Sequence, residues 1–282
     1  MATAHLKRWN MSFGTGQPLA VIAGLNVLEN LDLALSVGKE LKAICAELGL
    51  PYVFKASFDK ANRSSIKSYR GPGLKDGLAM LAEVKKQLNV PICTDLHEIE
   101  HAEPVAAVAD LVQIPAFLCR QTDLVVATAR ATAKAGGIVH VKKAQFLAPW
   151  DCKNIISKAR EAAPGLEIIL CERGASFGYN NLIVDMLAIG EMQKLGVPVT
   201  IDATHAVQLP GADPRTAGAS TGGRREGVPI IAKSAVAAGA DGVFLEFHPE
   251  PDKALCDGPS CLPLSGARAL LSTLKAVRAA VS

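Results

Sequence analysis

The chain has 282 residues, 49% of them hydrophobic, which is enough apolar material for the core of one large domain. Its formal charge is only +3, from 30 basic and 27 acidic residues, so it lacks the global basic field typical of nucleic-acid-binding proteins. Seven cysteines form no CxxC pair, and we expect reduced thiols in a cytoplasmic protein rather than disulfides or a zinc site. The N-terminal residues contain no apolar export signal, and charged residues interrupt every long apolar stretch, so we expect neither export nor membrane insertion.

Short apolar runs, each expected to be a buried strand, recur along the chain. In order they are 18–25, 51–56, 90–95, 111–116, 137–142, 167–172, 198–203 and 242–247. Amphipathic helical patterns lie between them or close the chain, at 31–48, 74–88, 124–135, 182–195, 228–238 and 264–281. Near-continuous apolar strands that alternate with helices predict a parallel sheet covered by helices, and eight such units predict a closed (β/α)8 TIM barrel. An open, doubly wound sheet is the alternative.

The residues before position 18 precede the first predicted barrel strand. We expect them to form a hairpin or a cap over the barrel floor. No linker, low-complexity tract or internal repeat divides the sequence, so we expect a single domain over residues 1–282.

A basic loop follows the second predicted strand, in the segment FKASFDKANRSSIKSYRGPG at 54–73. Its cations are Lys55, Lys60, Arg63, Lys67 and Arg70, among Gly, Ser and Asn residues. Two cations about 4 Å apart repel by about 4 kcal/mol at an effective dielectric near 20, so bringing them together favours a bound anion. The sequence therefore predicts a phosphate-binding loop, and a solvated basic loop is the alternative.

Polar and charged side chains stand at or just after the ends of the predicted strands. They are Asn26, Lys55, Asp95, Gln113, Lys142 with Lys143, Arg173, His205 and Glu246. In a barrel, strand ends converge at the C-terminal rim, where barrel enzymes place their sites. The pattern favours an enzyme that acts on a small phosphorylated or carboxylated substrate.

Nearly the whole chain resembles the 3-deoxy-D-manno-octulosonate 8-phosphate synthases, also called 2-dehydro-3-deoxyphosphooctonate aldolases. The motifs that carry the resemblance are, in order, FKASFDKANRSSIKSYRGPG, PICTDLHE, QIPAFLCRQTDL, VKKAQFLAP, CERGASFGYNNLIVDM, DATHAVQ, GGRRE and EFHPEPDKALCDGPS. The resemblance implies condensation of phosphoenolpyruvate with D-arabinose 5-phosphate and water, giving 3-deoxy-D-manno-octulosonate 8-phosphate and inorganic phosphate in lipopolysaccharide precursor (Kdo) biosynthesis. It also implies small-molecule substrates, no nucleic-acid or membrane partner, and a homo-oligomer, most often a tetramer.

The resemblance also implies roles for individual residues. Positions that match the phosphoenolpyruvate site are Lys55, Lys60, Lys143, Arg173 and His205; Asn62, Arg63 and Ser64 match the sugar-phosphate site, and Ser57, Gln113 and Glu246 are further substrate-binding positions. Arg120 matches an arginine that reaches the sugar phosphate from a neighbouring subunit. Lys143 as a surface lysine and Arg120 as an exposed helix-start residue are the structural alternatives.

Catalysis needs opposed acid and base groups. Crowding by other cations should lower the pKa of Lys60, which we expect to protonate the aldehyde oxygen. The water that adds to the developing cation needs a positioning group or base. Candidates for that role are His205, Asp95, Glu246 and Asp257, and the residues alone do not choose among them.

One branch of this family binds a divalent metal at four positions that match Asn26, His205, Glu246 and Asp257, with cysteine at the first. A neutral amide oxygen is a far weaker ligand than a thiolate, so the asparagine predicts a metal-independent enzyme without a cofactor. Asn26 would then join the catalytic set by ordering substrate or water. Cys256 is a conceivable substitute ligand, but adjacent side chains rarely converge on one ion.

Three alternatives compete with this interpretation. The first is 3-deoxy-D-arabino-heptulosonate 7-phosphate synthase, whose Lys-Pro-Arg-Thr-Ser pattern differs from the 60–64 segment KANRS here. The second, sialic acid synthase, has an antifreeze-like domain that this chain lacks. The third is a catalytically inactive barrel that binds phosphosugars, for which an acid/base set would be unnecessary. The Gly- and Ala-rich segment 211–223 is predicted to be a mobile lid.

Overall fold

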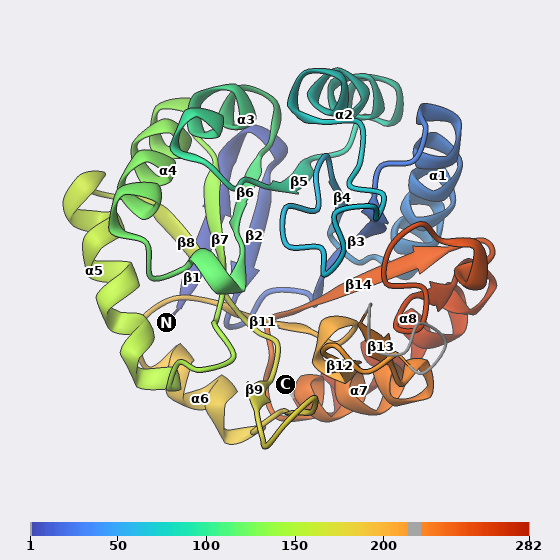
Figure 1. The fold of residues 1–282 in the computed structure, drawn as a ribbon. Coiled ribbons are helices and arrows are strands. Elements are labelled where there is room, and N and C mark those ends of the chain that lie inside the picture. Colours follow the sequence, from blue (N-terminus) through green and yellow to red (C-terminus); the bar gives the residue numbers. More distant parts are fainter. Residues whose placement is uncertain (1, 214–220, 282) are drawn as a thin grey trace.

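Parallel strands form a closed barrel surrounded by helices (Figure 1). The computed structural model describes residues 2–213 and 221–281. The barrel strands are β3 (Ala20–Val27), β4 (Tyr52–Ser57), β5 (Ile92–Asp95), β6 (Leu111–Ile114), β7 (Ile138–Lys142), β8 (Glu167–Glu172), β11 (Val199–Asp202) and β14 (Gly242–His248). They pair in chain order, and β11 pairs with both β8 and β14. This closure confirms the TIM barrel and excludes the open sheet.

The outer helices are α1 (Leu31–Leu48), α2 (Leu74–Leu88), α3 (Ala102–Val108), α4 (Thr122–Ala135), α5 (Cys152–Ala162), α6 (Leu187–Gln193), α7 (Val228–Ala237) and α8 (Ala267–Val281). Six of them overlap a helical pattern of the sequence analysis, whereas α3 and α5 do not. The helix predicted over 182–195 is wrong in its first turn, where Leu182–Ile183 forms β10 and pairs with β9 (Ala175–Ser176). The Leu187 N–H donates a hydrogen bond to Asp185 Oδ1 at 3.0 Å where α6 begins.

Helix α1 shows how local signals set an element's bounds. The Asn30 side chain accepts the Leu33 N–H at 2.8 Å, a typical N-cap. At the other end Gly49 adopts φ 67°, the left-handed conformation that glycine takes without strain. Between these caps an apolar stripe that includes Val37 and Leu41 faces the core.

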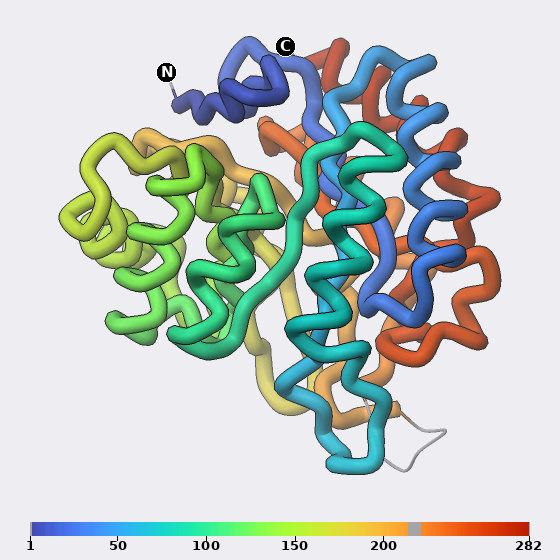
Figure 2. The backbone as a smooth tube through the Cα atoms, turned by 90° about the horizontal axis from the view of Figure 1, so that it is seen from above, coloured from blue at the N-terminus to red at the C-terminus, as the bar shows by residue number. Residues whose placement is uncertain are grey.

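The N-terminal residues close the floor of the barrel. Strands β1 (Thr3–Leu6) and β2 (Met11–Gly14) form an antiparallel hairpin, which confirms the predicted hairpin or cap. Its buried Leu6 and Phe13 pack in one cluster with inward residues of the barrel strands, among them Phe244. Figure 2 shows the dark blue hairpin at one end of the barrel and the cyan loop after β4 at the other.

Short elements decorate the opposite rim. β12 (Gln208–Leu209) pairs with β13 (Gly222–Gly223), and β15 (Leu262–Pro263) extends β14. Single 3-10 turns span Ile99–His101, Ala116–Leu118, Pro149–Asp151, His205–Val207, Arg225–Gly227, Pro251–Lys253 and Leu264–Gly266, and one more, Lys7–Trp9, connects β1 to β2 in the floor hairpin. Residues 214–220 of the predicted lid lie outside the described residues.

Candidate active site

Strand alternation points a ring of polar side chains into the C-terminal end of the barrel. Every second residue of a barrel strand faces the interior. The buried polar residues at these positions include Asn26, Lys55, Ser57, Asp95, Gln113, Lys142, Asp202 and Glu246. The structure therefore gathers the strand-end residues of the sequence analysis at one face, as a barrel requires.

Asn26 lies at the centre of this face because β3 is irregular. The register between β3 and β4 shifts between Gly24 and Val27. Position 24 needs glycine, since a Cβ there would come within 2.1 Å of the Lys55 carbonyl oxygen. The strands thus approach closely just before Asn26, whose side chain is buried.

The Asn26 amide nitrogen sits among the other three residues of the four-position set. Nδ2 donates to Glu246 Oε2 at 2.5 Å and to Asp257 Oδ2 at 3.3 Å, and it lies 3.4 Å from His205 Nε2. Asp257 reaches this point from a backbone with φ 50°, a left-handed conformation that aspartate tolerates better than most residues. The group that faces both carboxylates is therefore the Asn26 NH2, which donates hydrogen bonds and cannot coordinate a metal ion.

Glu246 is a buried carboxylate held in its charged form. Lys55 Nζ donates to Glu246 Oε1 at 2.7 Å, and both side chains are fully buried. Burial by itself would raise the pKa of Glu246, but the charges of His205 and Lys55 outweigh it and lower the pKa to about 2. The same balance of burial against His205 holds the pKa of Asp257 well below its ordinary value.

His205 is oriented from below by a buried ion pair. Its Nδ1 lies 2.7 Å from Asp202 Oδ2, so Nε2 faces Asn26 and lies 3.6 Å from Asp257 Oδ2. Lys142 Nζ pairs with the same Asp202 carboxylate and stands 3.7 Å from the Phe244 ring centroid. Asp202, the aspartate of the DATH motif, therefore contacts His205 directly, and the ammonium beside it is that of Lys142.

Lys60 differs from the expectation. Burial lowers its pKa, but the carboxylates of Glu246 and Asp95 outweigh burial and hold the pKa above its ordinary value. The predicted lowering of the Lys60 pKa is therefore wrong. The error arises because its neighbours in sequence are cations, whereas its neighbours in space include carboxylates.

Asp95 is fixed by two contacts. Ser57 Oγ donates to Asp95 Oδ1 at 2.5 Å, and His97 Nε2 lies 3.1 Å from Asp95 Oδ2. Burial would raise the pKa of Asp95, but the His97 hydrogen bond and the Lys60 charge hold it well below its ordinary value. Sequence reasoning missed His97, although its place in PICTDLHE, two residues after Asp95, was a signal.

Arg173 presents a free donor. Its Nη2 donates to Gln208 Oε1 at 2.8 Å, and Gln208 Nε2 in turn donates to Asp257 Oδ2 at 2.9 Å. Nη1 is buried and has no hydrogen-bond partner among the described residues. A buried, unpaired guanidinium N–H is costly, so this atom favours an anionic ligand.

Other predicted residues lie outside this cluster. Lys143 is buried, but its Nζ donates to the Ala144 and Leu147 carbonyls, both at 3.2 Å, and lies 3.5 Å from Glu172. It is thus not the surface lysine of the structural alternative. Arg63 Nη1 contacts Cys256 Sγ at 2.5 Å. Asn62, Ser64 and Arg120 are exposed.

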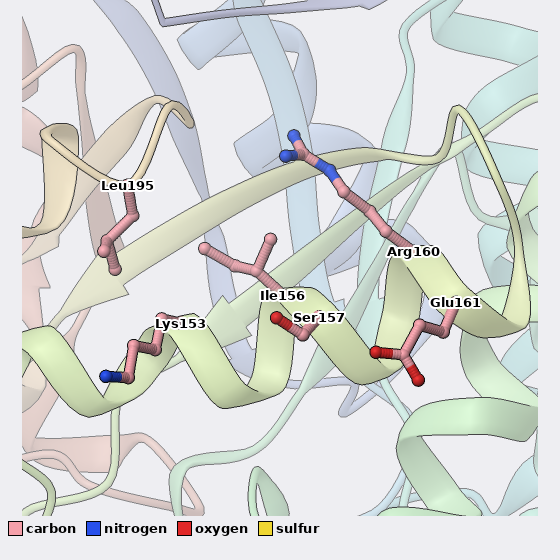
Figure 3. Close-up of a pocket in the computed structure, with 6 residues that line it drawn as sticks. All are labelled: Lys153, Ile156, Ser157, Arg160, Glu161 and Leu195. Carbon is pink, nitrogen blue, oxygen red and sulfur yellow. The ribbon is translucent and has the colours of Figure 1, made fainter.

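Two pockets flank different parts of the barrel. One, of about 330 Å³, borders the site and is lined by Arg63, Asp213, Thr221, Asp252, Ala254, Leu255, Cys256, Asp257, Gly258 and Pro259. The other, of about 480 Å³, lies on the outer helical layer and is lined by Lys153, Ile156, Ser157, Arg160, Glu161 and Leu195 (Figure 3). The first contains members of both the predicted sugar-phosphate and catalytic sets, so we take it as the approach to the site.

The chemistry of the cysteines matches the expectation for reduced thiols. All seven are buried and free. Within the described ranges, the chain has no helix both long and apolar enough to cross a membrane.

Comparison with known proteins identifies the family. Residues 2–282 match the model of the DAHP synthetase I family. The 2-dehydro-3-deoxyphosphooctonate aldolases of Desulfotalea psychrophila and Azoarcus sp. are both 54% identical, over 100% and 94% of this chain and 97% and 92% of their own. That of Citrifermentans bemidjiense is 52% identical over 99% of both chains. The chain therefore belongs to the DAHP synthetase I family and, within it, groups with the 2-dehydro-3-deoxyphosphooctonate aldolases.

Proposed function

We propose that this chain condenses phosphoenolpyruvate with D-arabinose 5-phosphate and water, releasing 3-deoxy-D-manno-octulosonate 8-phosphate and inorganic phosphate for lipopolysaccharide precursor synthesis. The observation that carries the proposal is the buried Arg173 Nη1, an unpaired donor beside an acid/base set at the barrel rim. The names of relatives with 52 to 54% identity support the same reaction. We also propose that the chain works as a single cytoplasmic domain.

The substrates bring several negative charges, which the site meets with fixed donors. Arg173 can grip an oxyanion with two N–H groups, and Lys55 and Lys60 supply further positive charge. The raised pKa keeps Lys60 protonated at neutral pH, so it donates a hydrogen bond to the aldehyde oxygen and stabilises the charge that develops there. Asn62, Arg63 and Ser64, from the exposed loop after β4, close over the sugar phosphate.

The addition of water is assigned to the group of residues around His205. His205 Nε2 faces the same point as the Asp257 and Glu246 carboxylates, and Asp202 holds its Nδ1. An imidazole with one nitrogen pinned in this way can pass a proton at the other. Asn26 Oδ1 is buried and has no hydrogen-bond partner among the described residues, so it can accept a hydrogen bond from the attacking water.

We further propose that the reaction needs no metal. The donor set does not suit a divalent ion, because the Asn26 Nδ2 group occupies the point between Glu246 and Asp257 and offers hydrogens there. Its N–H groups partly offset the negative charge that a cation would otherwise neutralise. Turning the amide would present a neutral oxygen, a weak ligand for zinc or ferrous iron.

A phosphate-release assay tests substrate and metal together. Phosphoenolpyruvate is supplied with arabinose 5-phosphate or with erythrose 4-phosphate, each with and without excess chelator. We expect release only with arabinose 5-phosphate and no effect of chelator. Preference for erythrose 4-phosphate would move the chain to the seven-carbon branch, chelator inhibition would overturn metal independence, and no release with either sugar would leave the non-catalytic binder.

We propose that the enzyme is a homo-oligomer, a tetramer by resemblance, and that Arg120 serves a neighbouring subunit. Large apolar side chains are exposed on the loops after β6, β7 and β8: Phe117, Phe146, Trp150, Phe177 and Tyr179. Such a concentration on neighbouring loops is typical of an interface. Mixing Lys60→Ala subunits with Arg120→Ala subunits should restore part of the activity that each lacks alone. No recovery after verified subunit exchange would argue that Arg120 acts within its own chain.

A further inference from the structure

A histidine lies beneath the site and has no part in the chemistry described above. His140, in the middle of β7, is fully buried inside the barrel. Its Nε2 lies 3.0 Å from Thr200 Oγ1 and its Nδ1 lies 3.3 Å from Gln113 Oε1. The ring also stacks on Phe244, with centroids 6.2 Å apart and 10° between planes. The β6–β7 register places Gln113 directly opposite His140.

The protons of this chain of contacts can be counted. Burial, reinforced by the Lys142 charge, lowers the pKa of His140 to about 3, so the ring is neutral and carries one N–H. The Thr200 hydroxyl has a single hydrogen and two acceptors within reach, His140 Nε2 at 3.0 Å and the Leu170 carbonyl oxygen at 3.2 Å. If the hydrogen takes the shorter contact, Nε2 accepts it, and the ring hydrogen is on Nδ1, which donates to Gln113 Oε1.

The consequence falls on the Gln113 amide. With Oε1 held by the ring, the Nε2 amide group points away from His140. An NH2 group turned to the site suits an anionic ligand, whereas the reversed amide would present a carbonyl oxygen to that anion. Which end of Gln113 meets the substrate thus depends on which nitrogen of His140 carries the hydrogen.

We propose that His140 is a positioning residue, whose Nδ1–H holds the Gln113 carboxamide with its NH2 group facing the bound phosphoenolpyruvate. The identity of that ligand rests on the proposed function. The orientation of the amide rests on the contacts of Thr200, His140 and Gln113 alone. His140 acts through Gln113 and touches no substrate itself.

The hydrogen can be located directly. Long-range proton–nitrogen NMR spectra of the wild-type chain, labelled with 15N-histidine, distinguish protonated from bare ring nitrogens. The His140 signals are those absent from His140→Leu. We expect a protonated Nδ1 and a bare Nε2 that do not change between about pH 5 and 8, where exposed histidines titrate. Protonation at Nε2, or titration within that range, would overturn the proposal without any variant having to fold.

Kinetics supply a second, independent readout. His140→Leu should raise KM for phosphoenolpyruvate about tenfold, as expected for one hydrogen bond to a charged group, and leave KM for arabinose 5-phosphate within about twofold. In a double-mutant cycle, His140→Leu combined with Gln113→Leu should be no worse than Gln113→Leu alone. The control is Thr128→Val, which removes a buried hydroxyl hydrogen bond in α4, outside the barrel.

Additive effects in the cycle, or an equal rise in both KM values, would reduce His140 to a packing residue. The proposed function and the positioning role of His140 can be refuted independently. A wild-type chain that releases phosphate with neither sugar defeats the proposed function, while the NMR measurement still decides the position of the His140 hydrogen.

Discussion

Replacing Asn26 with aspartate tests the charge arrangement of the site most directly. The change keeps the side-chain shape but turns the 2.5 and 3.3 Å contacts of Nδ2 with Glu246 and Asp257 into contacts between oxygens. At about 3.3 Å and an effective dielectric of 20, each ionised pair repels by about 5 kcal/mol, so two pairs repel by about 10 kcal/mol. Protonating an ordinary aspartate at pH 7 costs only about 4 kcal/mol. The new carboxyl should therefore take up a proton or a cation near neutral pH.

The readout is the difference in thermal midpoint between variant and wild type across pH, with chelator or with manganese. A carboxyl whose pKa is raised by folding stabilises at low pH and loses that contribution as pH rises, so Asn26→Asp should fall behind wild type toward alkaline pH and recover with metal. Asn154→Asp, the same change at an exposed position of α5, should show neither effect. An Asn26→Asp protein as stable as wild type at pH 8 without metal would refute the paired-carboxylate reasoning.

Two further variants test the supporting structure. The pKa of Glu246 is about 2, against an ordinary 4.5, so its contribution of about 3 kcal/mol is present above pH 4.5 and is lost as pH falls toward 2. Urea unfolding of Glu246→Gln should show a pH dependence shallower by that amount, and an unchanged slope would contradict the assignment. Asp110 accepts the Trp9 Nε1–H and the Ile92 N–H, each at 2.9 Å, so Asp110→Asn should cost about 2 kcal/mol and loosen the hairpin, seen by tryptophan fluorescence; unaltered unfolding would argue against this anchor.

The barrel could be predicted because each strand lies in a short, near-continuous apolar run, which burial on both faces favours. Each of the eight predicted runs overlaps a barrel strand, to within two residues at the strand's end. The 182–195 helix failed in its first turn because apolar spacing alone does not distinguish a short strand from a helix start. The information was present in Asp185, whose side chain accepts the Leu187 N–H and marks the later start.

The site was harder to predict than the fold, since its chemistry depends on which residues face each other across the barrel. The inward position of Lys142 could be predicted, because strand alternation places it on the same side as Ile138 and His140. The direction of the Lys60 pKa shift could not be predicted, because it depends on carboxylates far away in sequence, at positions 95 and 246.

The internal balance of charge leads to one more expectation. The buried cations Lys55, Lys60, Lys142 and Arg173 share the site with the carboxylates Asp95, Asp202, Glu246 and Asp257. With His205 neutral, this set of charges is balanced, so the bound substrate adds negative charge that burial makes costly to leave uncompensated. We expect phosphoenolpyruvate binding to be coupled to proton uptake, which calorimetry in two buffers of different ionisation enthalpy measures. Binding without proton uptake near neutral pH would mean that a cation outside this set neutralises the substrate's charge. The nearest candidate is Lys143, whose side chain would then turn toward the site.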